Sequence, residues 1–414
     1  MPASQDLLTF THGIALRGPD LTPQPFTSLV IRDGVIDSIN DSDADDASTP
    51  PGTGQHIDLG GAYLVPGLID AHVHFDLAAH PQAYERWLNP RAHLVRSLSL
   101  LHNGLVALQH GITSVRDLGC ADSLVLDYAA YVERGELTGP RVTAAGRPIT
   151  TTGGHCSEYG RVASGVEDTR EAVREQMALG ATVIKVIASG GISTPGDPHR
   201  PQFTDQELEA AVDEAHRLGL RVAAHAHSPV GIVMAVRAGV DSVEHAGFAD
   251  DESVALMREH GTVLVPTVVA LNHITDGVGI PPATVRKSLM ARDRYRANTR
   301  RAIEAGVTIA AGTDAGTALN PIGDLHDELD MYCERGMAPL EALRAATVTA
   351  GQLLGTGVGV LEVGRPADLL VVADNPRVDI RALRRPVHVI SRGRALSLSW
   401  LAKTVSELSA AVRG

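Results

Sequence analysis

Short apolar runs alternate with amphipathic stretches along most of this chain, a pattern that predicts strands followed by helices. From residue 64 onward, eight strands are predicted, at 64–74, 112–118, 141–149, 182–188, 221–227, 242–246, 262–267 and 307–313. Helical periodicity fills the intervals, at 90–110, 123–134, 168–179, 205–218, 230–238, 251–260 and 282–305. Eight strand–helix units in succession predict an α/β fold, a (β/α)8 TIM-like barrel over residues 64–357.

A doubly wound open sheet is the alternative arrangement of such units. It has no positive support, because no G-x-G-x-x-G motif follows the first predicted strand and the sequence contains no P-loop. The barrel is therefore the expected fold, with its reactive groups at the carboxyl ends of the strands.

Both ends of the chain carry short strand patterns in place of this alternation. Four apolar runs lie between residues 7 and 39, with Asp33-Gly34 as a tight turn, and strands return at 364–372 and 387–391. We expect residues 1–63 and 358–399 to pair into one small β-sandwich domain built from both termini. Residues 400–414 are expected to contain a terminal helix packed on the outside.

Composition argues against several classes of function. Lys and Arg total 36 against 49 Asp and Glu, and the formal charge of −13 disfavours a nucleic-acid or anionic-membrane partner. No run of about 18 apolar residues occurs, and the N-terminus lacks the pattern of a secretory signal. The three cysteines are scattered, as a reducing compartment permits. We expect a soluble cytoplasmic protein that acts on a small molecule.

The strand ends carry candidate metal ligands. His72 and His74 close the first predicted strand on the same face, and imidazole is the commonest nitrogen ligand of zinc. Further donors stand at other strand ends: Lys185 within an apolar run, His225, His227, His245 and Asp314. Each alone has an ordinary explanation, as an outward lysine, a core histidine or a turn-capping aspartate. Their joint occurrence at strand ends predicts a metal site.

These motifs resemble the amidohydrolase superfamily, in particular its binuclear branch, and the resemblance extends to Gly364-Arg-Pro-Ala-Asp-Leu369. It implies two divalent metal ions, with zinc as the expected metal, although such ligands suit Mn, Co and Fe as well. It also implies carbon dioxide held as a carbamate on the fourth-strand lysine. The ligand roles fall on His72, His74, Lys185, His225, His245 and Asp314.

Within the superfamily, Thr150-Thr-Thr-Gly-Gly-His155 and His225-Ala-His227 resemble prolidase-type dipeptidases that cleave Xaa-Pro, Xaa-Arg/Lys or related amides. Ochratoxin-cleaving amidohydrolases and imidazolonepropionases share much of the pattern. The resemblance implies hydrolysis of an amide C–N bond by a metal-bridging hydroxide, with a dipeptide or N-acyl amino acid as the expected substrate. A cyclic amide or imidazolone, and a xenobiotic amide or carbamate such as an ochratoxin-type compound, are the alternatives.

The same resemblance makes Asp314 the group that takes a proton during attack and passes it to the departing nitrogen. His227 faces the same side as His225 and is expected to act in catalysis or substrate binding, with a polar residue at the rim as the alternative. A non-catalytic scaffold of this fold would usually have lost ligands, whereas all six positions are filled here. A homo-oligomer is the expected assembly.

Three further residues are candidates for contact with the substrate. His155 follows two glycines, whose flexible backbone allows its ring to reach the pocket or simply to fix the loop. Tyr159 lies on the same loop and His273 follows the seventh predicted strand. Arg116 and Asp117, in contrast, are expected to tie neighbouring strands together.

Overall fold

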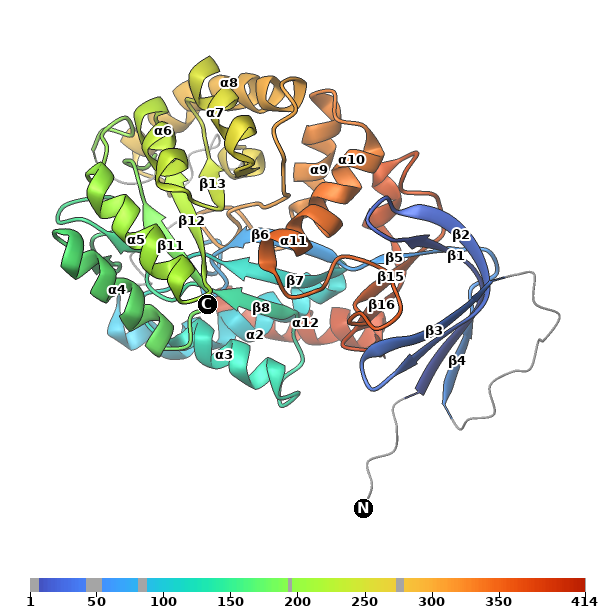
Figure 1. Ribbon diagram of the computed structural model, residues 1–414. Helices are drawn as coiled ribbons and strands as arrows, with labels where there is room; N and C mark the ends of the chain where they lie inside the picture. Colours follow the sequence, from blue (N-terminus) through green and yellow to red (C-terminus); the bar gives the residue numbers. More distant parts are fainter. Residues whose placement is uncertain (1–6, 42–53, 81–87, 193–195, 273–278, 414) are drawn as a thin grey trace.

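The computed structural model describes residues 7–41, 54–80, 88–192, 196–272 and 279–413 (Figure 1). Parallel sheets surrounded by helices form a large body, and a curved sheet made from both ends of the chain lies beside it (Figure 1). The three-stranded parallel sheet contains, in spatial order, β6 (Leu68–Val73), β7 (Ile112–Asp117) and β8 (Arg141–Ala144). The six-stranded sheet contains, in order, β10 (Arg161–Val162), β9 (Ile149–Thr150), β11 (Val183–Ile187), β12 (Arg221–Ala226), β13 (Ser242–His245) and β14 (Val263–Val265).

The predicted third and eighth strands are irregular. The third is divided into β8 and β9, and in place of a regular eighth strand the segment 307–315 forms two isolated bridges. These bridges nevertheless reach both sheets, because Ile309 pairs with Leu264 and Ala315 pairs with Val73. The amide of Asp314 donates to the carbonyl of His72 over 2.8 Å, and Asp314 adopts a positive φ of 60°, which takes the backbone out of the extended conformation. The prediction of a regular eighth strand is therefore wrong, although this segment bridges to β14 at Ile309 and to β6 at Ala315.

Helices cover the outer side of these strands (Figure 1). They begin with clear sequence signals: the Thr204 hydroxyl and the Glu207 carboxylate form a capping box, and Ser228 and Asp250 cap the two helices that follow. The helices are η1 (Pro90–Ala92), α2 (His93–Gln109), α3 (Leu124–Glu133), α4 (Val166–Ala178), α5 (Asp205–Arg217), α6 (Pro229–Ala238), α7 (Asp251–His260), η2 (Val268–Leu271) and α8 (Pro282–Glu304). After residues 307–313 come α9 (Leu325–Glu334), α10 (Pro339–Arg344), a π-helical turn η4 (Ala345–Thr349) and α11 (Ala350–Leu354).

The two chain ends pair into one sheet, with the order β17-β16-β15-β5-β1-β2-β3 and with β4 on β1. Its strands are β1 (Leu7–Arg17), β2 (Thr22–Arg32), β3 (Val35–Asp41), β4 (Gln55–Asp58), β5 (Tyr63–Pro66), β15 (Leu369–Val372), β16 (Pro386–Ser391) and β17 (Arg394–Leu396), with η5 (Ile380–Arg384) between β15 and β16. The small domain from both termini is present, but the predicted β-sandwich is replaced by one sheet. The physical reason is β5, which pairs with β1 on one edge and with β15 on the other.

The predicted strand 64–74 is in fact two strands that belong to different sheets. β5 lies in the small sheet and β6 in the parallel sheet, and the break falls at Gly67. A side chain at Gly67 would place its Cβ 2.1 Å from Oγ1 of Thr113, so only glycine permits this approach. Asp368 links the two bodies there, because its carbonyl accepts from the Gly67 amide and its carboxylate accepts from Arg141 over 2.6 Å.

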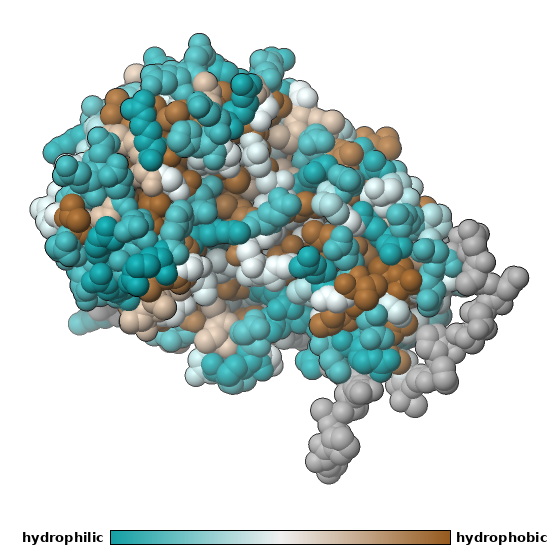
Figure 2. Space-filling view, in the orientation of Figure 1, coloured by the Kyte–Doolittle hydropathy of each residue, from teal (hydrophilic) through white to brown (hydrophobic). Residues whose placement is uncertain are grey.

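The terminal helix α12 (Leu398–Arg413) begins slightly earlier than predicted. It packs on α2 through a small cluster of Leu105, Leu108 and Leu401. In the part of the chain that the structure describes, no helix has the length and apolar character needed to cross a membrane. The face drawn in Figure 2 is mostly hydrophilic, with hydrophobic groups gathered at the small-sheet end.

Candidate metal centre

The carboxyl ends of the parallel strands surround a cavity of about 440 Å³. His72 in β6, His74 directly after it, and Asp314 all line this cavity. Oδ1 of Asp314 lies 3.4 Å from Nε2 of His72 and 3.2 Å from Nε2 of His74. One donor atom from each of the three lies within 4.8 Å of the others. The predicted H-x-H pair therefore converges with the predicted aspartate.

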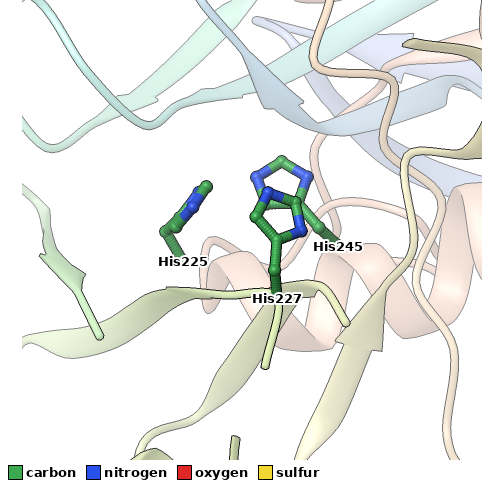
Figure 3. A group of neighbouring side chains, drawn as sticks. All are labelled: His225, His227 and His245. Atoms are coloured by element: carbon green, nitrogen blue, oxygen red, sulfur yellow. The ribbon is translucent and has the colours of Figure 1, made fainter. Parts of the chain in front are cut away.

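A second group of donors faces the same cavity from the neighbouring strands (Figure 3). His225 and His227 project from the end of β12, and His245 ends β13. Their ligand atoms also lie within 4.8 Å of one another. The rings of His227 and His245 are stacked, with centroids 4.9 Å apart, whereas His225 meets His227 edge-on. His227 is thus brought into a cluster with the two histidines that sequence reasoning gave to the metal.

Lys185 lies in β11 and is almost completely buried, with 3% of its surface exposed. It lines the same cavity, which excludes the alternative of an outward lysine. Among the residues that the structure describes, no carboxylate forms an ion pair with it. Burial lowers the pKa of Lys185 to about 8, although the Glu244 and Asp314 carboxylates act in the opposite direction.

Burial also decides the protonation of the imidazoles. It lowers the pKa of His72, His225 and His245 well below the ordinary value, so these rings are neutral at pH 7. For His74, burial acts in the same direction, but the hydrogen bond that the ring donates to Asp314 and the attraction of that carboxylate outweigh burial and raise the pKa. Neutral imidazoles and a carboxylate are the ligands that zinc and similar ions require. The residues present therefore fit a divalent metal centre.

Hydrogen bonds hold three of these rings in place. Nδ1 of His72 donates to Oε2 of Glu244 over 2.8 Å, and Nδ1 of His74 donates to the Gly119 carbonyl over 3.0 Å. Nδ1 of His245 bonds Oγ1 of Thr267 over 2.7 Å. In each ring Nδ1 is engaged, which leaves Nε2 available as a ligand.

The strand ends that carry these groups have strained backbone. His245, Ala246, Thr267 and Asp314 have φ values of 72°, 48°, 51° and 60°, a region that non-glycine residues rarely adopt. Such conformations cost about 1–3 kcal/mol each and occur mostly where function requires a particular side-chain direction. Their concentration around one cavity supports its assignment as the functional site.

Arg116 and Asp117 tie strands together, as expected. The Arg116 guanidinium donates to the Ala71 carbonyl in β6 and to Ser242 in β13. The Asp117 carboxylate accepts from the amides of Phe75 and Gly119.

Of the three candidates for contact with the substrate, His155 and Tyr159 line the cavity. His155 lines the cavity with its ring centroid 4.5 Å from that of His225, and burial lowers its pKa to about 3. A Cβ on Gly191 would lie 2.5 Å from the His155 ring, so this glycine admits the imidazole. Tyr159 also lines the cavity, and its hydroxyl donates to Sγ of Cys156 over 2.9 Å. His273 lies outside the described residues.

Sequence reasoning missed Tyr295, which reaches the cavity from α8. Its hydroxyl lies 2.7 Å from Nδ1 of His227, a bond between residues 68 positions apart. A Cβ on Gly247 would lie 1.7 Å from the Tyr295 ring, so glycine just after β13 makes room for it. Gly247 is the only local sequence signal for this contact, and it does not indicate which residue fills the space beside it.

The rest of the cavity wall is largely apolar. Among the described residues, Lys185 and Asp314 are the only lysine, arginine, aspartate or glutamate side chains that line it. Apolar groups make up much of the remainder: Leu118, Pro148, Ile187, Ile192, Ala270, Leu271, Ile280, Pro281 and Ala318. The site thus combines one polar floor with walls suited to an uncharged, apolar ligand surface.

Known proteins share this sequence and fold. The profile of the Amidohydrolase family matches residues 63–396. The ochratoxinase of Aspergillus niger is 36% identical over 371 residues, covering 80% of this chain and 75% of the relative. A solved Xaa-Pro dipeptidase with bound methionine in its active site has a TM-score of 0.84 at 30% identity, covering 95% of this chain and 100% of that one. A prolidase complexed with N-methylphosphonate-L-proline has a TM-score of 0.85 at 31% identity, covering 94% and 99%. These likenesses imply a TIM-like barrel with a small domain.

The contact between Tyr295 and His227 gives a testable prediction. Tyr295→Phe removes the hydroxyl that holds His227, so we expect kcat/KM for an amide substrate to fall about 10- to 100-fold as the ring loses its orientation. Tyr128→Phe is the matched control, because the buried Tyr128 hydroxyl has no hydrogen-bond partner among the described residues. Its kcat/KM should stay near that of the parent. Equal kinetics for both variants would contradict a role for Tyr295.

Proposed function

We infer the function from one premise: the chain belongs to the amidohydrolase family, whose members are hydrolases that act on C–N bonds and generally use divalent metals. On that basis we propose a binuclear metal-dependent amidohydrolase. The observation that carries this proposal is the convergence of two ligand groups, one of His72, His74 and Asp314 and one around His225 and His245, on one cavity.

The metal ligands follow from these two groups. His72, His74 and Asp314 would hold one ion, and His225 and His245 the other, with zinc as the proposed metal. Lys185, which lines the same cavity, would bridge the ions after its neutral amine adds carbon dioxide and loses a proton to form a carbamate. When bound, such ions generate a nucleophile from water at neutral pH and polarise the scissile carbonyl.

The chain's own residues supply the proton transfers and the orientation. Asp314 faces the cavity with Oδ1 close to both imidazoles of the first group, where its carboxylate can take the proton from the attacking water and pass it to the departing nitrogen. His227, held at Nδ1 by Tyr295, can direct Nε2 toward the substrate. Loss of the amine would then leave a carboxylate product.

The closed barrel is part of the same proposal. The hydrogen bonds of residues 309–315 to β6 and β14, and the pairing of β9 with β11, support eight units around one axis. In a (β/α)8 barrel, all the ligand-bearing strand ends lie at one face, as the cavity requires.

For the substrate we propose a dipeptide or an N-acyl amino acid. The cavity volume suits a small molecule, and an Xaa-Pro dipeptidase and a prolidase are among the structurally similar proteins. His155 and His227 are the polar groups that would donate to the free carboxylate. The apolar wall also supports a second candidate, a xenobiotic amide or carbamate of the kind that the name ochratoxinase suggests, because much of the cavity lining is hydrophobic.

The metal complement is the first test. We expect two ions per chain by elemental analysis, and loss of activity by orders of magnitude when a chelator removes them or when His72→Ala or His245→Ala removes a ligand. The matched control is His326→Gln, at a buried histidine that does not line the cavity, which should keep both ions. Full activity with a single tightly bound ion would overturn the binuclear assignment.

The role of Lys185 can be tested through chemical rescue. Lys185→Ala should lose metal and most turnover, because the bridging carbamate cannot form, and added acetate or formate should restore part of both by occupying the vacated space. Lys403→Ala, at an exposed position on α12, should show no response to added carboxylate. If Lys185→Ala kept two ions and near-normal turnover without added carboxylate, the lysine would be structural.

The substrate class is tested by comparing a free acid with its amide. The kcat/KM for an N-acyl amino acid should exceed that for its C-terminally amidated analogue by about 100-fold or more. In the analogue, the hydrogen-bond donors that pair with the carboxylate are left without their acceptor. In His155→Ala, the kcat/KM values for the free acid and for its amide should lie closer together. Equal kcat/KM values for the two compounds would reject a dipeptide or N-acyl amino acid as the substrate class and would support a xenobiotic amide.

A further inference from the structure

A buried ionic cluster lies behind the cavity wall. Arg116 has 1% of its surface exposed and extends from β7 to β13, where its guanidinium donates to Oε1 of Glu244 over 2.8 Å. The Ser242 hydroxyl donates to the same oxygen over 2.5 Å, and it accepts from Arg116 over 3.0 Å. Glu244 itself is completely buried. One oxygen of this carboxylate is therefore fully engaged in holding the cluster together.

The other oxygen of Glu244 contacts the candidate metal centre. Oε2 accepts the Nδ1 proton of His72 over 2.8 Å. The opposite ring atom, Nε2, faces Asp314 and the cavity. Because a carboxylate accepts hydrogen bonds and cannot donate them, it fixes the proton of this neutral ring on Nδ1 and leaves the lone pair on Nε2.

We propose that Glu244 is a positioning residue that keeps His72 in the tautomer able to bind a divalent cation, with Arg116 and Ser242 fixing the direction of its carboxylate. The inference rests on the proposed function, because it takes His72 as a metal ligand. It extends that proposal to residues that contact neither metal nor substrate. From the sequence alone, Glu244 and Ser242 have no expected role, and Arg116 is expected only to tie neighbouring strands together.

Replacement by glutamine separates this role from simple space filling. The amide has nearly the same shape but only one accepting oxygen. Arg116 is always a donor, so the amide oxygen must turn toward Arg116, and the NH₂ group then faces Nδ1 of His72. That imidazole can satisfy the NH₂ group only by accepting, which moves its own proton to Nε2. Glu244→Gln thus places a proton on the atom that should bind the metal.

The experiment measures metal affinity on protein freed of metal, by zinc competition with a chromophoric chelator, together with the melting temperature of the metal-free protein. For Glu244→Gln we expect the affinity for one of two zinc ions to fall about 10- to 100-fold, the usual effect of losing a partner of a metal-bound histidine. The affinity for the second ion should change much less, because His225 and His245 have other hydrogen-bond partners.

Two further variants distinguish positioning from structural damage. In Arg116→Met/Glu244→Gln, the amide oxygen is free to turn back to His72, so zinc affinity should recover above that of Glu244→Gln even though another buried interaction has been lost. Ser242→Ala disturbs the same cluster without changing the acceptor that faces His72. It should lower the melting temperature while leaving zinc affinity near that of the parent.

The outcomes are separable. A parent protein that binds no zinc would reject the proposed function itself. A parent that binds two ions, with Glu244→Gln binding both equally tightly, would reject only the positioning role. The same conclusion would follow if the double variant bound zinc no better than Glu244→Gln. If Glu244→Gln does not fold, Glu244→Asp, which retracts the carboxylate from His72, must weaken one zinc site for the proposal to stand.

Discussion

The parallel register of β11, β12 and β13 fixes the distances on which the rest of the site depends. Ile187 pairs with His225 and Ala226 pairs with His245, so the strand hydrogen bonds themselves set how far apart the two imidazoles lie. A slip of one residue would turn every side chain of a strand to its opposite face. These strands are buried on both faces, so such a slip would also bury polar groups in the packing against the helices. The same packing that stabilises the sheet therefore preserves the geometry of the candidate ligands.

Burial in this interior has two chemical consequences. It keeps the imidazoles of His72, His225 and His245 neutral, so no proton has to leave these three rings before a cation binds. It also lowers the pKa of Lys185 to about 8, and a group with that pKa is a neutral amine in an appreciable fraction of molecules at pH 7. Only the neutral amine can add carbon dioxide. One low-dielectric environment thus favours both the neutral form of these three imidazoles and the neutral amine of Lys185.

The sequence allowed the fold and the strand-end groups to be predicted because their signals are local. Alternation along a strand places His72 and His74 on one face, and the apolar run around Lys185 indicates an inward side chain. The contacts that orient these groups could not be predicted, since Glu244 reaches His72 across 172 residues and Tyr295 reaches His227 from a helix. The division of the first strand escaped prediction as well, because the crowding at its glycine comes from a neighbouring strand.

Charge balance connects the ionic cluster to the lysine. Without cations, Asp314 and Glu244 formally balance Lys185 and Arg116 in and behind the cavity wall. Two divalent ions would add four positive charges to this buried site, where uncompensated charge is costly. Conversion of the lysine from a cation to a carbamate anion removes two of them without moving the backbone. The carbamate would in turn be poorly stabilised without the ions beside it. In the proposed centre, metal binding and lysine modification would therefore favour each other by the same free energy, as reciprocal linkage requires.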